Sequence, residues 1–168
     1  MPKIIENLRE RFISEVENQL KKESYEAVTI RSIAKACGVG IGTVYNYFPS
    51  KESLIAAFLL EDWNICIENI QTVSETSETP EPVLRSIFDQ LLLFSGRHET
   101  VFHSVEAVSG YAGSFNRYHD LLRSQLAGPL QKYCGNDFSA QFIAESLLTW
   151  TLAGKSFDDI YQIIKKII

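Results

Sequence analysis

Apolar residues recur along the chain at intervals of three and four, which is the period of amphipathic helices, and no stretch alternates convincingly with period two. Residues 3–22 place an apolar stripe along one side of a first helix. Thr29 is an N-cap for a second, short helix that Gly38 ends. A third helix runs to about Tyr47, where Pro49 interrupts it. The pattern therefore predicts an all-α chain.

Further helices follow at the same period. Ser50 is placed to cap a long helix over residues 51–73, and the polar, proline-containing stretch 72–82 is predicted to be a loop. Helical pattern resumes over 82–94, and residues 95–114 are expected to form one short helix and a bend. Three helices are then predicted over residues 115–133, 138–153 and 155–167.

Composition narrows the class of protein. A chain of 168 residues that is 45% hydrophobic is too apolar for disorder, and no apolar run approaches the roughly 20 residues that span a bilayer. The first residues lack the apolar core of a signal peptide, so a cytoplasmic protein is expected. The three cysteines are far apart and form no CxxC pair, which favours small buried side chains over a disulfide framework or a zinc site.

The charge is distributed unevenly. The chain carries a net charge of −5, yet residues 1–55 hold eight lysines and arginines against seven acidic residues, while residues 56–168 hold eight against fourteen. Any contact with nucleic acid is therefore expected in the first third of the chain.

The stretch CGVGIG, residues 37–42, has three interpretations. A dinucleotide loop needs a preceding strand and a third glycine where Thr43 stands, and a P-loop needs GK[ST], so nucleotide binding is disfavoured. A glycine-rich joint in a helical protein is the second interpretation. The third is the turn of a helix-turn-helix, which requires two short helices and a tight turn with glycine.

The flanking residues favour the helix-turn-helix. Ala34 is small enough to let the next helix approach, Gly38 can adopt the left-handed conformation of a sharp turn, and Val39 is the apolar residue that holds the crossing. Val44 and Phe48 return to the core side. The other positions of this short helix form a polar, aromatic or very small face that suits an exposed contact: Ile41, Gly42, Thr43, Tyr45, Asn46 and Tyr47.

Residues 29–55, TIRSIAKACGVGIGTVYNYFPSKESLI, resemble the DNA-binding signature of the tetracycline-repressor (TetR) family of bacterial transcription regulators. The resemblance is specific for residues 1–60. It implies a three-helix helix-turn-helix DNA-binding domain over residues 1–50 and a helical ligand-binding and dimerisation bundle over residues 51–168. It also implies a dimer whose recognition helices enter successive major grooves of a palindromic double-stranded operator. Gly40 departs from the family, which usually has a serine or a similar cap there.

Side-chain chemistry suggests a role for each DNA-facing residue. Arg31 can reach a guanine edge or a phosphate, or remain a solvated surface residue. Ile41 can pack on a thymine methyl group or inside the protein, and Gly42 lets the DNA approach closely. Gly40 caps the recognition helix without a hydroxyl, and weaker DNA binding is expected from that loss.

The remaining DNA-facing residues are expected to position the protein on the DNA backbone. Hydroxyls of Thr43, Tyr45 and Tyr47 suit phosphate oxygens. The ring of Tyr45 can also pack on a thymine methyl group, and a structural role for Tyr45 stays open. Thr29 and Lys51 lie at helix N-termini, which also favour phosphate. Asn46 has the chemistry to read adenine but a less favourable helical phase.

Aromatic residues are concentrated between positions 58 and 135, where helical spacing alone makes most of them core residues. The family resemblance implies a pocket for a small apolar or amphipathic effector among them, with a few polar groups. The ligand-binding residues predicted here are Trp63, Phe88, Phe102, His103, Tyr111, Phe115 and Tyr118.

The last two helices carry more apolar surface than one small domain needs to bury, and the resemblance implies a four-helix interface across a two-fold axis. The predicted interface residues are Phe142, Trp150, Phe157, Tyr161 and Ile164. No nucleophile–base motif, cofactor motif or metal-ligand spacing appears, so no enzyme, cofactor or metal site is expected.

The function expected is a ligand-responsive DNA-binding regulator that acts as a repressor and is released by its effector. The alternative is a helical protein-interaction dimer that kept the motif but lost operator binding.

Overall fold

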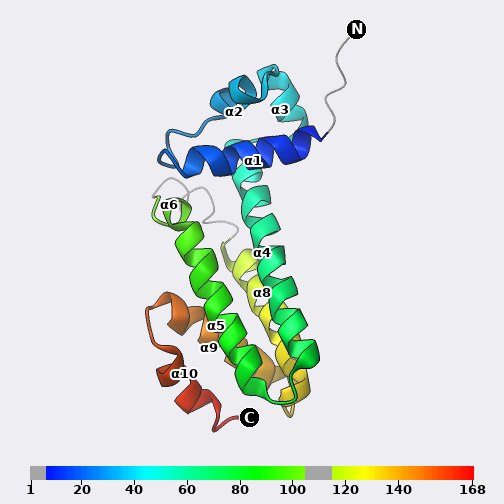
Figure 1. The fold of residues 1–168 in the computed structure, drawn as a ribbon, viewed down its shortest axis with the longest axis vertical. Helices are drawn as coiled ribbons and strands as arrows, with labels where there is room; N and C mark the ends of the chain where they lie inside the picture. Colours follow the sequence, from blue (N-terminus) through cyan, green and yellow to red (C-terminus); the bar gives the residue numbers. More distant parts are fainter. Residues whose placement is uncertain (1–6, 105–114) are drawn as a thin grey trace. The chain divides into compact units, whose positions relative to one another are not determined.

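The computed structural model describes residues 7–104 and 115–168, and within these ranges it is helical and contains no strand. The all-α prediction is thereby confirmed. The described residues form two compact units, one of residues 7–62 and 98–104 and the other of residues 63–97 and 115–168. Figure 1 shows the helices of each unit. No helix of the described residues is both long and apolar enough to span a bilayer.

The N-terminal unit contains α1 (Leu8–Leu20), α2 (Ile30–Cys37), α3 (Ile41–Tyr47), the start of α4 (Lys51–Thr76) and the short α6 (Glu99–Phe102). Each of these helices packs apolar side chains into a shared core. Fully buried members include Phe12 of α1, Ile33 of α2, Val44 of α3 and Ile55 of α4. Short helices such as α2 and α3 are marginal alone, so this shared core is what stabilises them.

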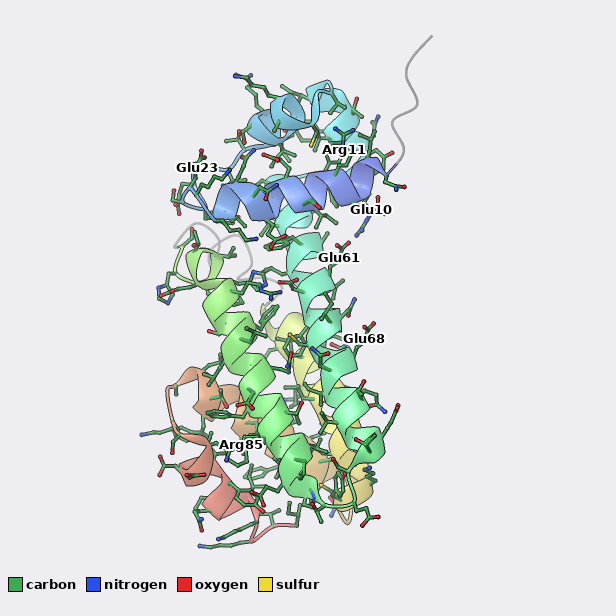
Figure 2. All side chains as sticks on the ribbon, viewed as in Figure 1. Glu10, Arg11, Glu23, Glu61, Glu68 and Arg85 are labelled. Atoms are coloured by element: carbon green, nitrogen blue, oxygen red, sulfur yellow. The ribbon has the colours of Figure 1, made fainter. Side chains whose placement is uncertain are left out.

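The second unit contains the rest of α4, α5 (Pro80–Arg97), α8 (Phe115–Ala127), a 3₁₀ helix η1 (Gly128–Tyr133), α9 (Asp137–Leu152) and α10 (Phe157–Ile164). Helix α9 is its central element, since Ala140, Ile143, Ala144 and Leu147 are all fully buried. Arg85 of α5, labelled in Figure 2, places its guanidinium 3.6 Å from the ring centroid of Phe157 of α10. This cation–π contact and the core together hold α10 on the bundle.

The boundary between the units falls inside α4. Leu54, Ile55 and Phe58 pack in the N-terminal core, whereas Trp63 and Ile70 pack in the other core. The first three turns of α4 therefore bury their apolar face with α1 and α2.

The polar stretch 72–82 is mostly helical, contrary to the prediction of a loop. Helix α4 continues to Thr76, and α5 starts at Pro80, which leaves three residues between them. Thr72 and Thr76 donate their hydroxyls to carbonyl oxygens one turn earlier, at 2.9 and 3.2 Å. Proline is well tolerated at the first position of a helix because that position needs no N–H donor. Local polarity was therefore a poor signal for a helix end here.

Candidate nucleic-acid interface

The α2–turn–α3 segment is built by local interactions. The Thr29 hydroxyl accepts a hydrogen bond from the Ser32 amide at 3.0 Å, and the Ser32 hydroxyl accepts one from the Thr29 amide at 3.1 Å. The two bonds form a capping box. Gly38 ends α2 in the left-handed region with φ of 69°, and the Val39 amide then donates to the Ala34 carbonyl. The Thr29 cap and the Gly38 stop predicted from sequence are confirmed.

Helix α3 buries one side and exposes the other. Val44 is fully buried and Phe48 nearly so, as the sequence pattern predicted. Tyr45 and Tyr47 are each about half exposed, at 51% and 47%. A Cβ added at Gly42 would meet no atom within 4 Å, so that side of α3 is open. A helix that packs along one line and leaves the rest of its surface open can be inserted into a groove of DNA.

Arg11 of α1, labelled in Figure 2, contacts the end of α2, where the turn to α3 begins. Its Nη2 donates to the carbonyl oxygen of Cys37 at 3.0 Å, at the C-terminus of α2, where a positive charge is favoured. Burial raises the pKa of the Cys37 thiol, so the thiol stays neutral in this position.

Five of the predicted DNA-facing residues line one surface groove of about 540 Å³ in the N-terminal unit. They are Thr29, Arg31, Ile41, Tyr45 and Lys51, which come from α2, α3 and α4. The N-terminal residues of α2 and of α4 line this groove, and helix N-termini favour anions such as phosphate. The other predicted residues lie on or beside α3 outside the groove lining: Gly40, Gly42, Thr43, Asn46 and Tyr47.

The groove also contains residues that sequence reasoning missed. Glu26 and Glu52 line it together with Arg31 and Lys51, so two carboxylates accompany two cations. The Ser104 hydroxyl donates to Glu26 at 2.5 Å, and this hydrogen bond is the main reason that the pKa of Glu26 is lowered. Glu26 precedes Thr29 by three residues, and no local motif marked it.

Lys51 is placed at the groove by its neighbours. Its ammonium lies 3.9 Å from the ring centroid of Tyr25, a tyrosine whose side chain is fully buried. A rigid aromatic face holds a cation in place by a cation–π interaction. Ser50 and Ser53 form a second capping box, each hydroxyl accepting from the other's amide at 3.1 Å, and so define the start of α4.

The predicted ligand-binding residues are not all brought together. Trp63 and Phe88 are buried in the core of the second unit, and Trp63 donates from Nε1 to Gln125 at 2.7 Å. Phe102 and His103 belong to the N-terminal unit and are exposed there. Tyr111 lies outside the described residues, and the side chains of Phe115 and Tyr118 lie outside them as well.

Sequence reasoning did not single out the environment of His98. Its ring is almost fully buried, at 1% exposure, with Nε2 2.9 Å from the Asp62 carboxylate and the edge of Phe58 against it. This Asp62–His98 pair joins α4 to the start of α6 within the N-terminal unit. Among the described residues, no cluster of His, Cys, Asp and Glu side chains has a geometry for holding a metal ion.

The predicted dimer residues divide into two groups. Phe142 and Trp150 of α9 are 47% and 50% exposed, whereas Phe157 and Ile164 of α10 are buried in the core of their own unit. Tyr161 is partly buried, stacks on Phe157 and donates to Glu81 at 3.1 Å. Of these five residues, the two on α9 are therefore the most exposed, while α10 packs its buried apolar face onto α5 and α9.

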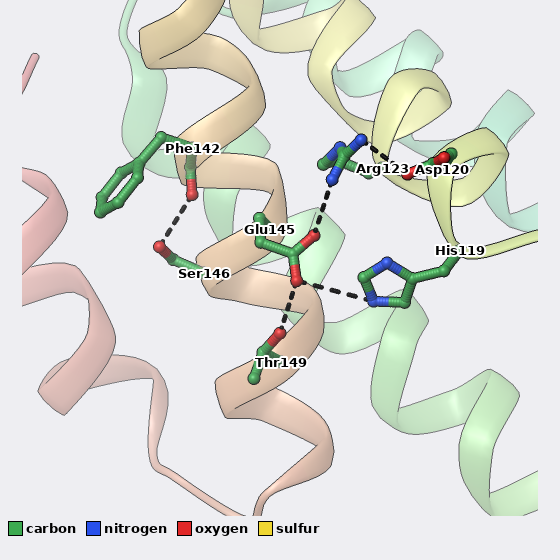
Figure 3. Close-up of polar contacts among 7 residues, drawn as sticks. All are labelled: His119, Asp120, Arg123, Phe142, Glu145, Ser146 and Thr149. Carbon is green, nitrogen blue, oxygen red and sulfur yellow. Dashed lines mark hydrogen bonds and ion pairs between the residues drawn. The ribbon is translucent and has the colours of Figure 1, made fainter. Parts of the chain in front are cut away.

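A polar cluster lies beside the exposed part of α9. Figure 3 shows Glu145 of α9 between two residues of α8, with His119 Nε2 and Arg123 Nη1 each 3.6 Å from its carboxylate. Thr149 donates to the same carboxylate at 2.9 Å, and Arg123 also pairs with Asp120 at 2.7 Å. These contacts hold α8 against α9, and Figure 3 shows the ring of Phe142 pointing away from them, on the other side of α9.

The sequence is similar to known regulatory proteins. Residues 14–58 match the family model of bacterial regulatory proteins, tetR family. An HTH-type transcriptional regulator of Staphylococcus aureus (strain bovine RF122 / ET3-1) is 30% identical over 122 residues, and one of strain MRSA252 is 28% identical. Each match covers 67% of this chain and 66% of the relative, so the chain spans just under two thirds of these relatives' length.

Solved structures share the fold. A TetR family repressor, AlkX, from a Dietzia strain has a TM-score of 0.62 at 19% identity, covering 95% of this chain and 96% of its own. The regulator FadR from Bacillus subtilis, solved in complex with stearoyl-CoA, has a TM-score of 0.55 at 18% identity, covering 95% and 98%.

Proposed function

The chain belongs to the tetR family of bacterial regulatory proteins, and we propose that it is a ligand-responsive repressor that binds a palindromic operator as a homodimer. The observation that carries the proposal is the shared groove. The open side of α3 and the N-termini of α2 and α4 present hydroxyl, aromatic and cationic groups to one space. Such a surface combines backbone-positioning groups with groups that reach base edges.

Individual roles follow from position. Thr29 and Lys51, at the N-termini of α2 and α4, would hold phosphates, since backbone N–H groups and the helix dipole add to their own hydrogen bonds. Arg31 would contact a guanine edge or a phosphate, and Ile41 and Tyr45 would meet thymine methyl groups. Thr43, Asn46 and Tyr47 would contact the DNA flanking this groove, and Gly40 and Gly42 would permit close approach.

The homodimer would form through α9. Phe142 and Trp150 are large aromatic residues, half exposed, on the helix that also carries exposed Phe138 and Leu152. Large exposed apolar patches are typical of interaction surfaces. Two copies related by a two-fold axis would place two recognition helices about 34–36 Å apart, one turn of DNA, which matches a palindrome.

The effector would be a small apolar or amphipathic molecule held among the aromatic residues of the second unit, near Trp63 and Phe88. The complex of FadR with stearoyl-CoA is a precedent in the same fold for an amphipathic ligand. Helix α4 belongs to both cores, so a ligand that shifts its second half would also displace the residues that begin at Lys51. Ligand binding and DNA release would then be linked reciprocally. The chain would act in the cytoplasm, where the chromosome is.

The experiment that tests this function is a binding selection of the purified protein against fragmented DNA of its source genome. An enriched palindrome, released on addition of an effector, supports the proposal. Stearoyl-CoA, with coenzyme A alone as the control, is the first effector probe. A folded dimer that enriches no sequence contradicts it.

Two observations favour a second candidate, a helical interaction protein that has lost operator binding. Glu26 and Glu52 balance the charges of Arg31 and Lys51 in the groove, and Gly40 offers no capping hydroxyl. The two candidates differ in a measurable way, because specific DNA binding weakens steeply as salt rises and a protein-interaction dimer shows no such affinity.

A further inference from the structure

Residues 98–104 belong to the N-terminal unit, although α5, which precedes them, belongs to the other unit. In this segment, Val101 is 3% exposed and packs in the core formed by α1, α2, α3 and α4. Ser104 is 7% exposed. The segment that continues from α5 is therefore a structural part of the DNA-facing unit.

Ser104 makes a specific polar contact in that unit. Its hydroxyl donates to Oε1 of Glu26 at 2.5 Å, across 78 residues of sequence. Glu26 lies in the connection between α1 and α2 and lines the groove beside Thr29 and Lys51. A hydroxyl bound to a carboxylate makes a short, charge-assisted hydrogen bond, which fixes where the negative charge points.

The position of this carboxylate affects the groove electrostatically. The hydrogen bond from Ser104 is the largest cause of the lowered pKa of Glu26, and the positive charge of Lys51 lowers it further. Glu26 is therefore ionised at neutral pH and close enough to Lys51 to be influenced by it. A carboxylate that turned toward Lys51 would neutralise part of that charge and would also repel an incoming phosphate.

We propose that Ser104 is a positioning residue for DNA binding, which anchors the Glu26 carboxylate and so limits how far this carboxylate neutralises Lys51 in the groove. The inference rests on the proposed function, since it requires that the groove receives the DNA backbone. It makes the segment after α5 a second control on DNA affinity. Displacement of Ser104 lowers the affinity without any change in the conformation of α2 or α3.

The test compares Ser104→Ala, Glu26→Gln and the double variant. The probe is a fluorescent duplex that carries the palindrome selected by the wild-type protein, titrated over a range of salt concentrations. Ser104→Ala is expected to weaken binding by about two- to fivefold, the range of a surface charge interaction. It should also reduce the slope of log K against log salt by up to about one per protomer, because less of the Lys51 charge meets phosphate.

Glu26→Gln removes the charge that Ser104 holds. This variant should bind at least as tightly as the wild type, and adding Ser104→Ala to it should change neither affinity nor slope. Ser104→Thr keeps the hydroxyl and should restore wild-type binding. The matched control is Ser74→Ala in the other unit, where a serine of similar burial donates to the Pro129 carbonyl at 3.0 Å. It should lower the unfolding temperature and leave DNA affinity unchanged.

The outcomes are distinguishable. Wild-type affinity and slope in Ser104→Ala overturn the inference while the proposed function stands. The inference is also overturned if Ser104→Ala lowers DNA affinity equally in the wild-type protein and in the Glu26→Gln variant. The serine would then act through the fold rather than through the carboxylate. A wild-type protein that binds no duplex overturns the proposed function itself, and the inference with it.

Discussion

The ring of Tyr47 packs edge-on against the ring of Phe12, with centroids 5.6 Å apart, although Tyr47 remains about half exposed. Phe12 is a fully buried residue of α1. Tyr45, two residues earlier on α3, lines the groove instead. The two tyrosines of α3 therefore differ in role: Tyr47 supports the packing of α3 on α1, and Tyr45 faces the space proposed for DNA.

Replacing Tyr45 with alanine should weaken operator binding by about tenfold or more and leave stability nearly unchanged, because one base contact contributes roughly 1–3 kcal/mol. Replacing Tyr47 with alanine should lower both affinity and stability, since an aromatic pair contributes about 0.5–1.5 kcal/mol beyond its buried area. Fluorescence anisotropy with an operator duplex and chemical unfolding separate the two quantities. Equal losses of stability in both variants would contradict this division.

The turn between α2 and α3 should be sensitive to Gly38. Its φ of 69° is left-handed, and a Cβ there meets nothing within 4 Å, so the penalty of alanine is backbone strain rather than a clash. Gly38→Ala is expected to lower the free energy of unfolding by about 1–2 kcal/mol. Gly42→Ala is the control, because Gly42 is helical and alanine is the better helix former. Denaturant titration measures both, and a destabilised Gly42→Ala would be inconsistent with the open surface.

Salt dependence should separate phosphate contacts from base contacts. Lys51→Ala should weaken binding to all duplexes alike and reduce the salt slope by about one per protomer. Arg31→Ala should do the same if its guanidinium meets a phosphate, and should instead relax specificity at one position if it reads guanine. Anisotropy titrations with the operator and with single-base variants distinguish these results. A Lys51→Ala protein with an unchanged slope would remove Lys51 from the backbone contacts.

Two aromatic residues near the C-terminus should behave differently. Trp150→Ala should weaken self-association and preserve the fold of one copy, because Trp150 is half exposed on α9. Phe157→Ala should lower the stability of the second unit by about 3–5 kcal/mol, since Phe157 is 3% exposed against Phe88, Tyr161 and Arg85. Analytical ultracentrifugation and thermal unfolding report these effects. A Trp150→Ala protein that remains fully dimeric would exclude Trp150 from the interface.

Stability should fall at high pH partly through Cys37. Burial raises the pKa of this thiol above its ordinary value of 9.0, so the folded protein keeps a proton that the unfolded chain loses. The contribution is therefore full below the unfolded pKa and is lost as pH rises through the folded pKa. In the Cys37→Ala variant, the unfolding free energy should therefore fall less steeply with pH above about pH 9 than in the wild type. An equally steep fall in both proteins would contradict this prediction. Cys134 and Tyr161, whose pKa values are also raised by burial, remain in both proteins and cancel in the comparison.

Local features of the N-terminal region could be predicted because they depend on neighbouring residues. The Thr29 cap, the Gly38 stop and the core positions of Val44 and Phe48 are all set within a few residues. The prediction of a loop over residues 72–82 was wrong because it relied on local polarity. In the structure, Pro80 is the first residue of a helix. Polarity reports solvent exposure, and an exposed helix is as polar as a loop.

The sequence by itself determined the helical class, the helix-turn-helix and the chemistry offered by α3, because helical periodicity, caps and glycine turns are encoded over short distances. Only the tertiary structure decided which of these groups share a groove, since Glu26 and Ser104 meet across 78 residues. It also decided that α10 buries Phe157 and Ile164 while α9 leaves Phe142 and Trp150 exposed. Apolar side chains on both helices look alike in sequence, and the packing partners alone determine which are removed from water.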